Sequence, residues 1–186
     1  NGDHVTVKRV DGQNEYDVAD GKLNVKTGDI IVLKVTAKQH YENVQVKAEG
    51  VTVISNAETS QYTISGFTEA FTIDITADPV KYSVEIDMIA VSGDQVQSET
   101  PNAARLAVSE TEFVENSGKL DIAYGSSYTY TATLATGYEF DGWYDSVTVV
   151  DGIVTARGNK ISGDLTYAGK VEGDYKLIAV FKLGEF

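Results

Sequence analysis

The amino-acid sequence repeats itself, and this repeat constrains the fold more than any other feature of the chain. Residues 20–42, DGKLNVKTGDIIVLKVTAKQHYE, reappear as residues 117–139, SGKLDIAYGSSYTYTATLATGYE, at an offset of 97. A second match, at an offset of 104, relates residues 67–77 to residues 171–181. Because each copy of such a repeat has to bury the same pattern of side chains, the sequence predicts two modules of one fold.

The matched segments alternate apolar and polar residues with a period of two, which is typical of half-buried strands. The predicted core face of the first copy is Ile31, Leu33, Val35 and Ala37, and that of the second copy is Tyr128, Tyr130, Ala132 and Leu134. The residues between them in the second copy are all threonine, so we expect that side of the strand to face outward.

The predicted fold is therefore mainly β, with two small tandem β-rich modules that are either β-grasp-like or immunoglobulin-like sandwiches. The first module spans residues 1–79 and the second residues 80–186, because Pro79 interrupts strand pairing. The second module carries insertions at about 88–116 and 151–164. It has at most one short helix, for which residues 101–108, PNAARLAV, are the best candidate. The short connector predicts a stiff rod.

Composition narrows the range of partners. The formal net charge of −13 disfavours nucleic acid and anionic membranes, because contact would bring like charges together. No apolar run approaches the roughly 20 residues that span a bilayer, so we expect no membrane insertion. The chain has no cysteine and only two histidines, which argues against disulfides, thiolate chemistry and a zinc site. No cofactor is predicted.

Two further segments point to a known family. Residues 137–145, GYEFDGWYD, and the closing strand at residues 173–182, GDYKLIAVFK, resemble the divergent internalin B-type repeat domains of bacterial surface proteins. The matched residues are Gly125, Leu134, Gly137, Tyr138, Phe140, Gly142, Trp143, Gly173, Asp174, Leu177, Ala179, Val180 and Phe181. The resemblance covers residues 117–182 well and the first module more loosely, since that module lacks the tryptophan.

This resemblance implies a function. Such repeats are small β-rich modules strung in tandem on secreted or cell-wall-anchored bacterial proteins, where they act as spacers or adhesive segments. It implies an extracellular, non-catalytic region. We further expect this region to be monomeric by itself, with a host or cell-surface protein or a glycan as its partner. The acidic, cysteine-free and threonine-rich strands agree with an exposed surface protein.

The only tryptophan lies in the family motif. At the offset of 97, Trp143 corresponds to Val46, and this aliphatic counterpart predicts that the indole fills a core. Successive side chains alternate along a strand, so a buried Trp143 predicts an exposed Tyr144. Tyr144 with its neighbours Asp141 and Asp145 is then the candidate ligand-binding site. A carbohydrate-binding module attached to a polysaccharide-degrading enzyme is the alternative function, and it predicts a row of exposed aromatic side chains.

Other chemistry has weaker support. Four acids near turns, Asp141, Asp145, Asp151 and Asp164, suggest calcium, but their spacing matches no EF-hand loop, and solvated turn acids are the expected state. Neither histidine lies in a nucleophile motif, so an enzyme is not predicted. A third alternative is a pilin or adhesin subunit that pairs through an edge strand.

Overall fold

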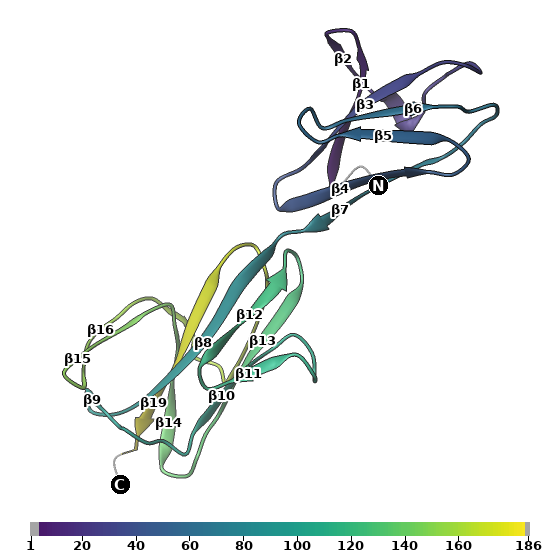
Figure 1. The fold of residues 1–186 in the computed structure, drawn as a ribbon. Helices are drawn as coiled ribbons and strands as arrows, with labels where there is room; N and C mark the ends of the chain where they lie inside the picture. Colours follow the sequence, from purple (N-terminus) through teal and green to yellow (C-terminus); the bar gives the residue numbers. More distant parts are fainter. Residues whose placement is uncertain (1–3, 185–186) are drawn as a thin grey trace. The chain divides into compact units, whose positions relative to one another are not determined.

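The computed structural model describes residues 4–184, and the chain divides into two compact units, Asn1–Val80 and Lys81–Phe186 (Figure 1). The described residues form strands and one short 3-10 helix, Ala19–Gly21, and they contain no α-helix. The predicted mainly β fold is confirmed, with a sandwich-type arrangement of sheets. No helix in the described part of the chain is long and apolar enough to cross a membrane.

Unit 1 packs a five-stranded sheet against an antiparallel pair of strands. The larger sheet has the order β2-β1-β3-β6-β5, and β4 pairs with β7 in a separate sheet. The strands of unit 1 are β1 (Val5–Asp11), β2 (Asn14–Asp17), β3 (Ile31–Ala37), β4 (Tyr41–Ala48), β5 (Thr52–Asn56), β6 (Gln61–Ser65) and β7 (Ile73–Pro79).

Unit 2 packs a sheet of order β11-β10-β13-β18 against a larger one of order β15-β16-β9-β8-β19-β14-β17, with β12 paired to β8. Its strands are β8 (Lys81–Ser92), β9 (Gln95–Val96), β10 (Ala103–Ala107), β11 (Phe113–Glu115), β12 (Gly118–Ala123), β13 (Ser127–Thr133), β14 (Tyr138–Tyr144), β15 (Val147–Val150), β16 (Ile153–Arg157), β17 (Lys160–Ser162), β18 (Thr166–Lys170) and β19 (Tyr175–Leu183).

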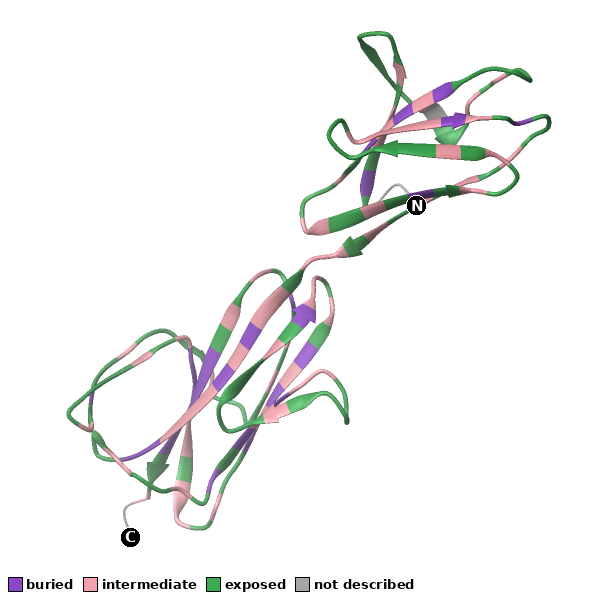
Figure 2. Cartoon of the chain, viewed as in Figure 1, coloured by how far each residue is buried: buried purple, intermediate pink, exposed green. Residues whose placement is uncertain are grey.

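Each unit encloses its own core (Figure 2). In unit 1, the buried residues are Val5, Ile31, Leu33, Val35, Val46, Ile64 and Phe67. In unit 2, they include Val84, Ile86, Leu106, Tyr128, Tyr130, Trp143, Leu177, Ala179 and Phe181. The period-two alternation of β3 and β13 therefore placed most of the predicted core face correctly. Leu134 is an exception at 39% exposure, because β13 ends one residue earlier.

The internal repeat is visible in the pairing of strands. β3 lies between β1 and β6 as β13 lies between β10 and β18, and β4 pairs antiparallel with β7 as β14 pairs with β19. Unit 2 adds β8, which runs parallel to β19 and antiparallel to β12. No strand of unit 1 in the described residues occupies the position of β8.

The helix predicted for residues 101–108 is wrong, because these residues form β10. Ala104 and Leu106 are buried, whereas Ala103, Arg105 and Ala107 are more exposed, which is the burial pattern of a strand. β10 pairs with β11 on one edge and with β13 on the other. Pairing on both edges of the strand outweighs a local helix preference that is worth only a few tenths of a kcal/mol per residue.

Candidate functional site

The indole of Trp143 fills the core of unit 2, as predicted. The side chain is fully buried, and its ring centroid lies 5.3 Å from that of Tyr130 and 5.4 Å from that of Phe140. The indole Nε1 donates a hydrogen bond to the carbonyl oxygen of Asp164 at 3.1 Å. Its counterpart Val46 is also buried, in the core of unit 1. The tryptophan is therefore a structural filler and not a ligand platform.

The expectation that Tyr144 is exposed is wrong. Trp143 and Tyr144 do lie on opposite faces of the sheet, but Tyr144 is only 8% exposed. On this second face it packs with Ile178 and Val180, and Ile89 and Val147 contact the same cluster. Alternation decides which face a side chain takes, whereas its exposure depends on what covers that face, and here both faces are covered.

Strand β14 contains a β-bulge between Phe140 and Gly142, which shifts its register with β19. Gly142 has a φ of +148°, and a Cβ atom there would lie 2.7 Å from the backbone oxygen of Ser162. Only glycine fits at this position, because β17 approaches the backbone of β14 so closely. Gly142 thus has a packing role.

Asp141 is held by the protein's own donors. Lys182 Nζ lies 2.6 Å from Asp141 Oδ1, and the hydroxyl of Tyr144 donates to Oδ2 at 3.0 Å. Burial by itself raises the pKa of this carboxyl, but the hydrogen bonds from Lys182 and Tyr144 outweigh burial, so that the pKa of Asp141 is lowered. The Nε atom of Arg157 lies 3.8 Å from the same carboxylate.

Asp145 is engaged in a separate loop interaction. Its carboxylate accepts hydrogen bonds from the backbone N–H and the side-chain Nδ2 of Asn159, both at 2.8 Å, and from the hydroxyl of Ser146 at 3.1 Å. The hydrogen bond from the Asn159 side chain is the main reason why the pKa of Asp145 is lowered. Ligand binding by Tyr144, Asp141 and Asp145 stays a prediction, and a ligand would have to compete with these bonds.

The calcium alternative gains no geometric support. Within residues 4–184, no three or more histidine, aspartate or glutamate side chains are grouped closely enough to hold a metal ion. The exposed large aromatic side chains of the described part are Tyr16 in unit 1 and Phe113 in unit 2, and Phe113 is covered on one face by the guanidinium of Arg105 at 3.9 Å. Neither unit therefore shows the row of exposed aromatic rings that was predicted for a carbohydrate-binding module.

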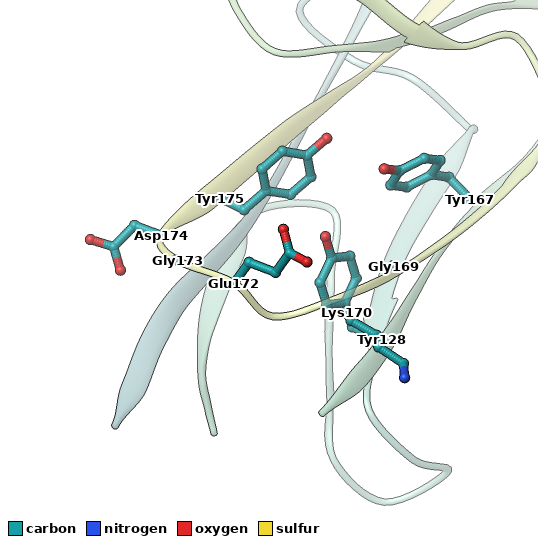
Figure 3. A pocket seen from close by; sticks show the side chains of 8 residues that line it. All are labelled: Tyr128, Tyr167, Gly169, Lys170, Glu172, Gly173, Asp174 and Tyr175. Carbon is teal, nitrogen blue, oxygen red and sulfur yellow. The ribbon is translucent and has the colours of Figure 1, made fainter. Parts of the chain in front are cut away.

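A pocket of about 400 Å³ lies elsewhere, where β18 leads into β19 (Figure 3). We call it the tyrosine pocket. Figure 3 shows the hydroxyls of Tyr167 and Tyr175 turned toward each other, with the Glu172 carboxylate and the Tyr128 hydroxyl beneath them, while Asp174 points away. The residues that line the pocket are Tyr128, Tyr167, Gly169, Lys170, Glu172, Gly173, Asp174 and Tyr175.

The floor of the tyrosine pocket depends on a cross-strand pair. Tyr128 on β13 is paired with Gly169 on β18, and a Cβ atom at Gly169 would lie 2.7 Å from the Cζ atom of Tyr128. The tyrosine ring therefore lies directly over the glycine backbone. Such an aromatic residue opposite a glycine stabilises the pair and fixes the ring in place.

The hydroxyls of Tyr128 and Tyr175 stay protonated to unusually high pH. Burial, helped by neighbouring Tyr167 and Glu172, raises the pKa of Tyr128 to about 12. Burial also raises the pKa of Tyr175, and a hydrogen bond with Tyr167 adds to this effect. The pocket thus offers neutral hydroxyl donors, aromatic faces and one exposed carboxylate, which is chemistry suited to a polyol. Sequence reasoning singled out neither Tyr167 nor Tyr175, because the pocket forms only when three strands meet.

The first and last strands of unit 2 form a long parallel ladder. β8 and β19 are paired without interruption from Val84↔Tyr175 to Val91↔Lys182. β19 is also paired with β14, and Leu177, Ala179 and Phe181 on its inner face are fully buried. On the outer face, Lys176 Nζ lies 3.7 Å from Asp87 and 4.0 Å from Glu85 on β8.

Comparisons with known proteins add little to this picture. No family model matches the chain, and no curated protein matches it. Among solved structures, the chain is similar to a mutant of the major pilin from Streptococcus pyogenes, with 12% sequence identity and a TM-score of 0.31. That match covers 91% of this chain and 74% of the pilin.

Proposed function

We propose that this chain is a non-catalytic spacer from a secreted or cell-wall-anchored bacterial surface protein, of the internalin B-type repeat class, and that it bears mechanical load. The observation that carries the proposal is the parallel ladder between β8 and β19. We expect the isolated region to be monomeric, to bind no nucleic acid, and to have a host or cell-surface protein or a glycan as its partner.

The direction of the two strands decides how unit 2 responds to tension. The chain enters unit 2 at the amino end of β8 and leaves at the carboxyl end of β19. Because the strands are parallel, these two points lie at opposite ends of one ladder. Tension therefore loads all its hydrogen bonds together in shear, and they have to break at once rather than one after another.

Unit 1 offers a comparison within the same chain. Its first strand, β1, pairs with β2 and β3, whereas its last strand, β7, pairs with β4. No ladder joins the first strand to the last strand in the described part of unit 1. Tension across this unit passes through side-chain packing between the sheets, which resists shear less well. We expect unit 1 to unfold at a lower force than unit 2.

Single-molecule pulling of the whole chain from its two ends tests this proposal. We expect two unfolding events, a weak one from unit 1 and a strong one from unit 2, which lengthen the chain by at most about 270 Å and about 360 Å at about 3.4 Å per released residue. The control moves the attachment point from the amino terminus to Ser92→Cys at the far end of β8. A single cysteine can serve as this handle because the sequence contains no native cysteine.

The control changes only the direction of force on the same ladder. With handles at Ser92→Cys and at the carboxyl terminus, both attachment points lie at one end of the parallel pair, so the bonds open singly and the strong event weakens. Two results would contradict the proposal that the ladder bears load. One is an unfolding force of unit 2 that is the same in both pulling directions, and the other is unfolding of unit 2 before unit 1.

The tyrosine pocket favours a second candidate function, carbohydrate binding. If a glycan binds there, Tyr175→Phe should weaken binding by about threefold to tenfold, because one neutral hydrogen bond is lost while the ring is retained. An array of bacterial and plant polysaccharides probed with the intact chain measures this effect. Tyr16→Ala, at an exposed ring of unit 1, is the matched control. Glycan binding that is unchanged in Tyr175→Phe would place the site elsewhere.

A further inference from the structure

One edge of the small sheet in unit 1 is open where the corresponding edge in unit 2 is paired. β7 pairs with β4, and no other strand within residues 4–184 pairs with β7. At the offset of 104, Ile73–Pro79 corresponds to residues 177–183 of β19, whose second edge is covered by β8. The corresponding edge is therefore paired in unit 2, on β19, and unpaired in unit 1, on β7.

The core beneath the open edge is only half covered. Ile73, Ile75 and Ala77 on the inner face of β7 pack against the core of unit 1 but remain half-buried. Their counterparts Leu177, Ala179 and Phe181 are fully buried in unit 2. Part of this difference comes from β8, which supplies Val84, Ile86 and Ala90 to the core of unit 2 and has no counterpart in unit 1.

The internal repeat also identifies the segment of unit 1 that corresponds to the second neighbour of β8. Residues 22–26 correspond to residues 119–123 of β12, which pair antiparallel with β8. In unit 1 these residues belong to no strand, although Leu23 and Val25 pack on the core and alternate with exposed neighbours. Both neighbours of β8 in unit 2 therefore have counterparts in unit 1, where β7 pairs with β4 alone and residues 22–26 pair with no strand.

The other open edge of this sheet, on β4, is a poorer acceptor. β4 carries a β-bulge between Glu42 and Gln45, with Asn43 at a φ of +51°, and bulges obstruct further pairing. β7 has no such irregularity. The Val80 N–H donates to the His40 carbonyl, so by alternation the N–H groups of Ala77 and Ile75 point away from β4, toward the open edge.

We propose that β7 and residues 22–26 form an acceptor site for one extended peptide segment of a partner, which runs parallel to β7 as β8 runs parallel to β19. The segment has apolar residues at every second position, to complete the core above Ile73, Ile75 and Ala77. Backbone hydrogen bonds supply affinity and the alternate side chains supply specificity, which is the β-augmentation mode.

The outer face of β7 indicates the charge of the bound segment. Asp74 and Asp78 are exposed there, at the positions of Ile178 and Lys182 in unit 2. In the register of unit 2, the residue opposite Asp74 corresponds to Asp87 of β8. Like charges directly opposite each other destabilise a pair of strands, so the partner segment carries a neutral or basic residue at this position.

The test uses the intact chain and a synthetic peptide with the sequence of residues 81–92, KYSVEIDMIAVS. Thr76 is exposed on β7, and the parallel register places it opposite peptide position Ile89. The chain with Thr76→Cys should therefore form a disulfide with the Ile89→Cys peptide. The Glu85→Cys peptide should not react, because its cysteine lies four residues away, at about 13 Å.

Binding strength gives an independent measurement. Fluorescence anisotropy of the labelled peptide against the wild-type chain should show binding, and the Asp87→Lys peptide should bind up to about fivefold more tightly. Absence of binding by both peptides, or equal cross-linking of the two cysteine peptides, would overturn the proposal. So would Thr76→Cys chains that cross-link to each other faster than to the peptide, because the occupant would then be a second copy. None of these outcomes depends on the pulling experiment.

Discussion

Replacing Trp143 by alanine is expected to lower the free energy of unfolding of unit 2 by about 3–5 kcal/mol, the range found for large aromatic residues truncated in a core. The indole is fully buried among Tyr130 and Phe140, so the substitution leaves a cavity in the centre of the sandwich. It also leaves the carbonyl of Asp164 without its indole donor, which adds to the loss.

Urea unfolding followed by circular dichroism and amide exchange measures this loss. Since each unit has its own core, the transition of unit 1 should stay in place while that of unit 2 moves to lower urea. Trp143→Phe is the matched control, because it keeps an aromatic ring and removes the hydrogen bond, and it should cost less than alanine. An unchanged unit 2 in Trp143→Ala would show that the indole does not hold this core together.

Alkaline pH is expected to unfold unit 2 through its buried tyrosines. The pKa of Tyr128 is about 12 in the folded protein, against an ordinary value near 10, and burial also raises the pKa values of Tyr130 and Tyr175. Above pH 10 the unfolded chain loses these protons while the folded unit keeps them. The folded state then binds more protons, so stability falls as pH rises.

The stability from each tyrosine is fully present below about pH 10 and is lost as pH rises through its folded pKa. For Tyr128 the loss is about 1.4 kcal/mol per pH unit between about pH 10 and 12, and the other two tyrosines add to it. Tyrosinate absorbance and circular dichroism, recorded together during a pH titration, should show cooperative ionisation that coincides with unfolding of unit 2. Tyr128→Phe should flatten the decline, and an equal slope in this variant would contradict the assignment.

Local sequence patterns predicted much of the fold. Alternation along residues 31–37 and 128–133 identified core faces correctly, because a strand repeats every two residues whatever it pairs with. Comparison of the two copies identified Trp143 as a core residue through its counterpart Val46. The helix expected at residues 101–108 failed, since these residues pair with β11 on one edge and with the distant strand β13 on the other, and a helix period does not reveal either partner.

The candidate sites were much less predictable. Tyr144 was placed on the correct face but with the wrong exposure, because the cover comes from Ile178 and Val180 on another strand. The tyrosine pocket joins Tyr128, Tyr167 and Tyr175, which share no motif and meet only where β13, β18 and β19 come together.

By itself, the sequence determined that this protein is a duplicated, strand-rich chain whose two copies each bury an alternating apolar face. That information is local, because it depends on residues two positions apart and on two aligned segments. Only the tertiary structure decided that β8 lies beside β19 in unit 2 and that the same edge is open on β7 in unit 1. Strand pairing depends on backbone hydrogen bonds between distant segments, and neither partner's side-chain pattern specifies the other.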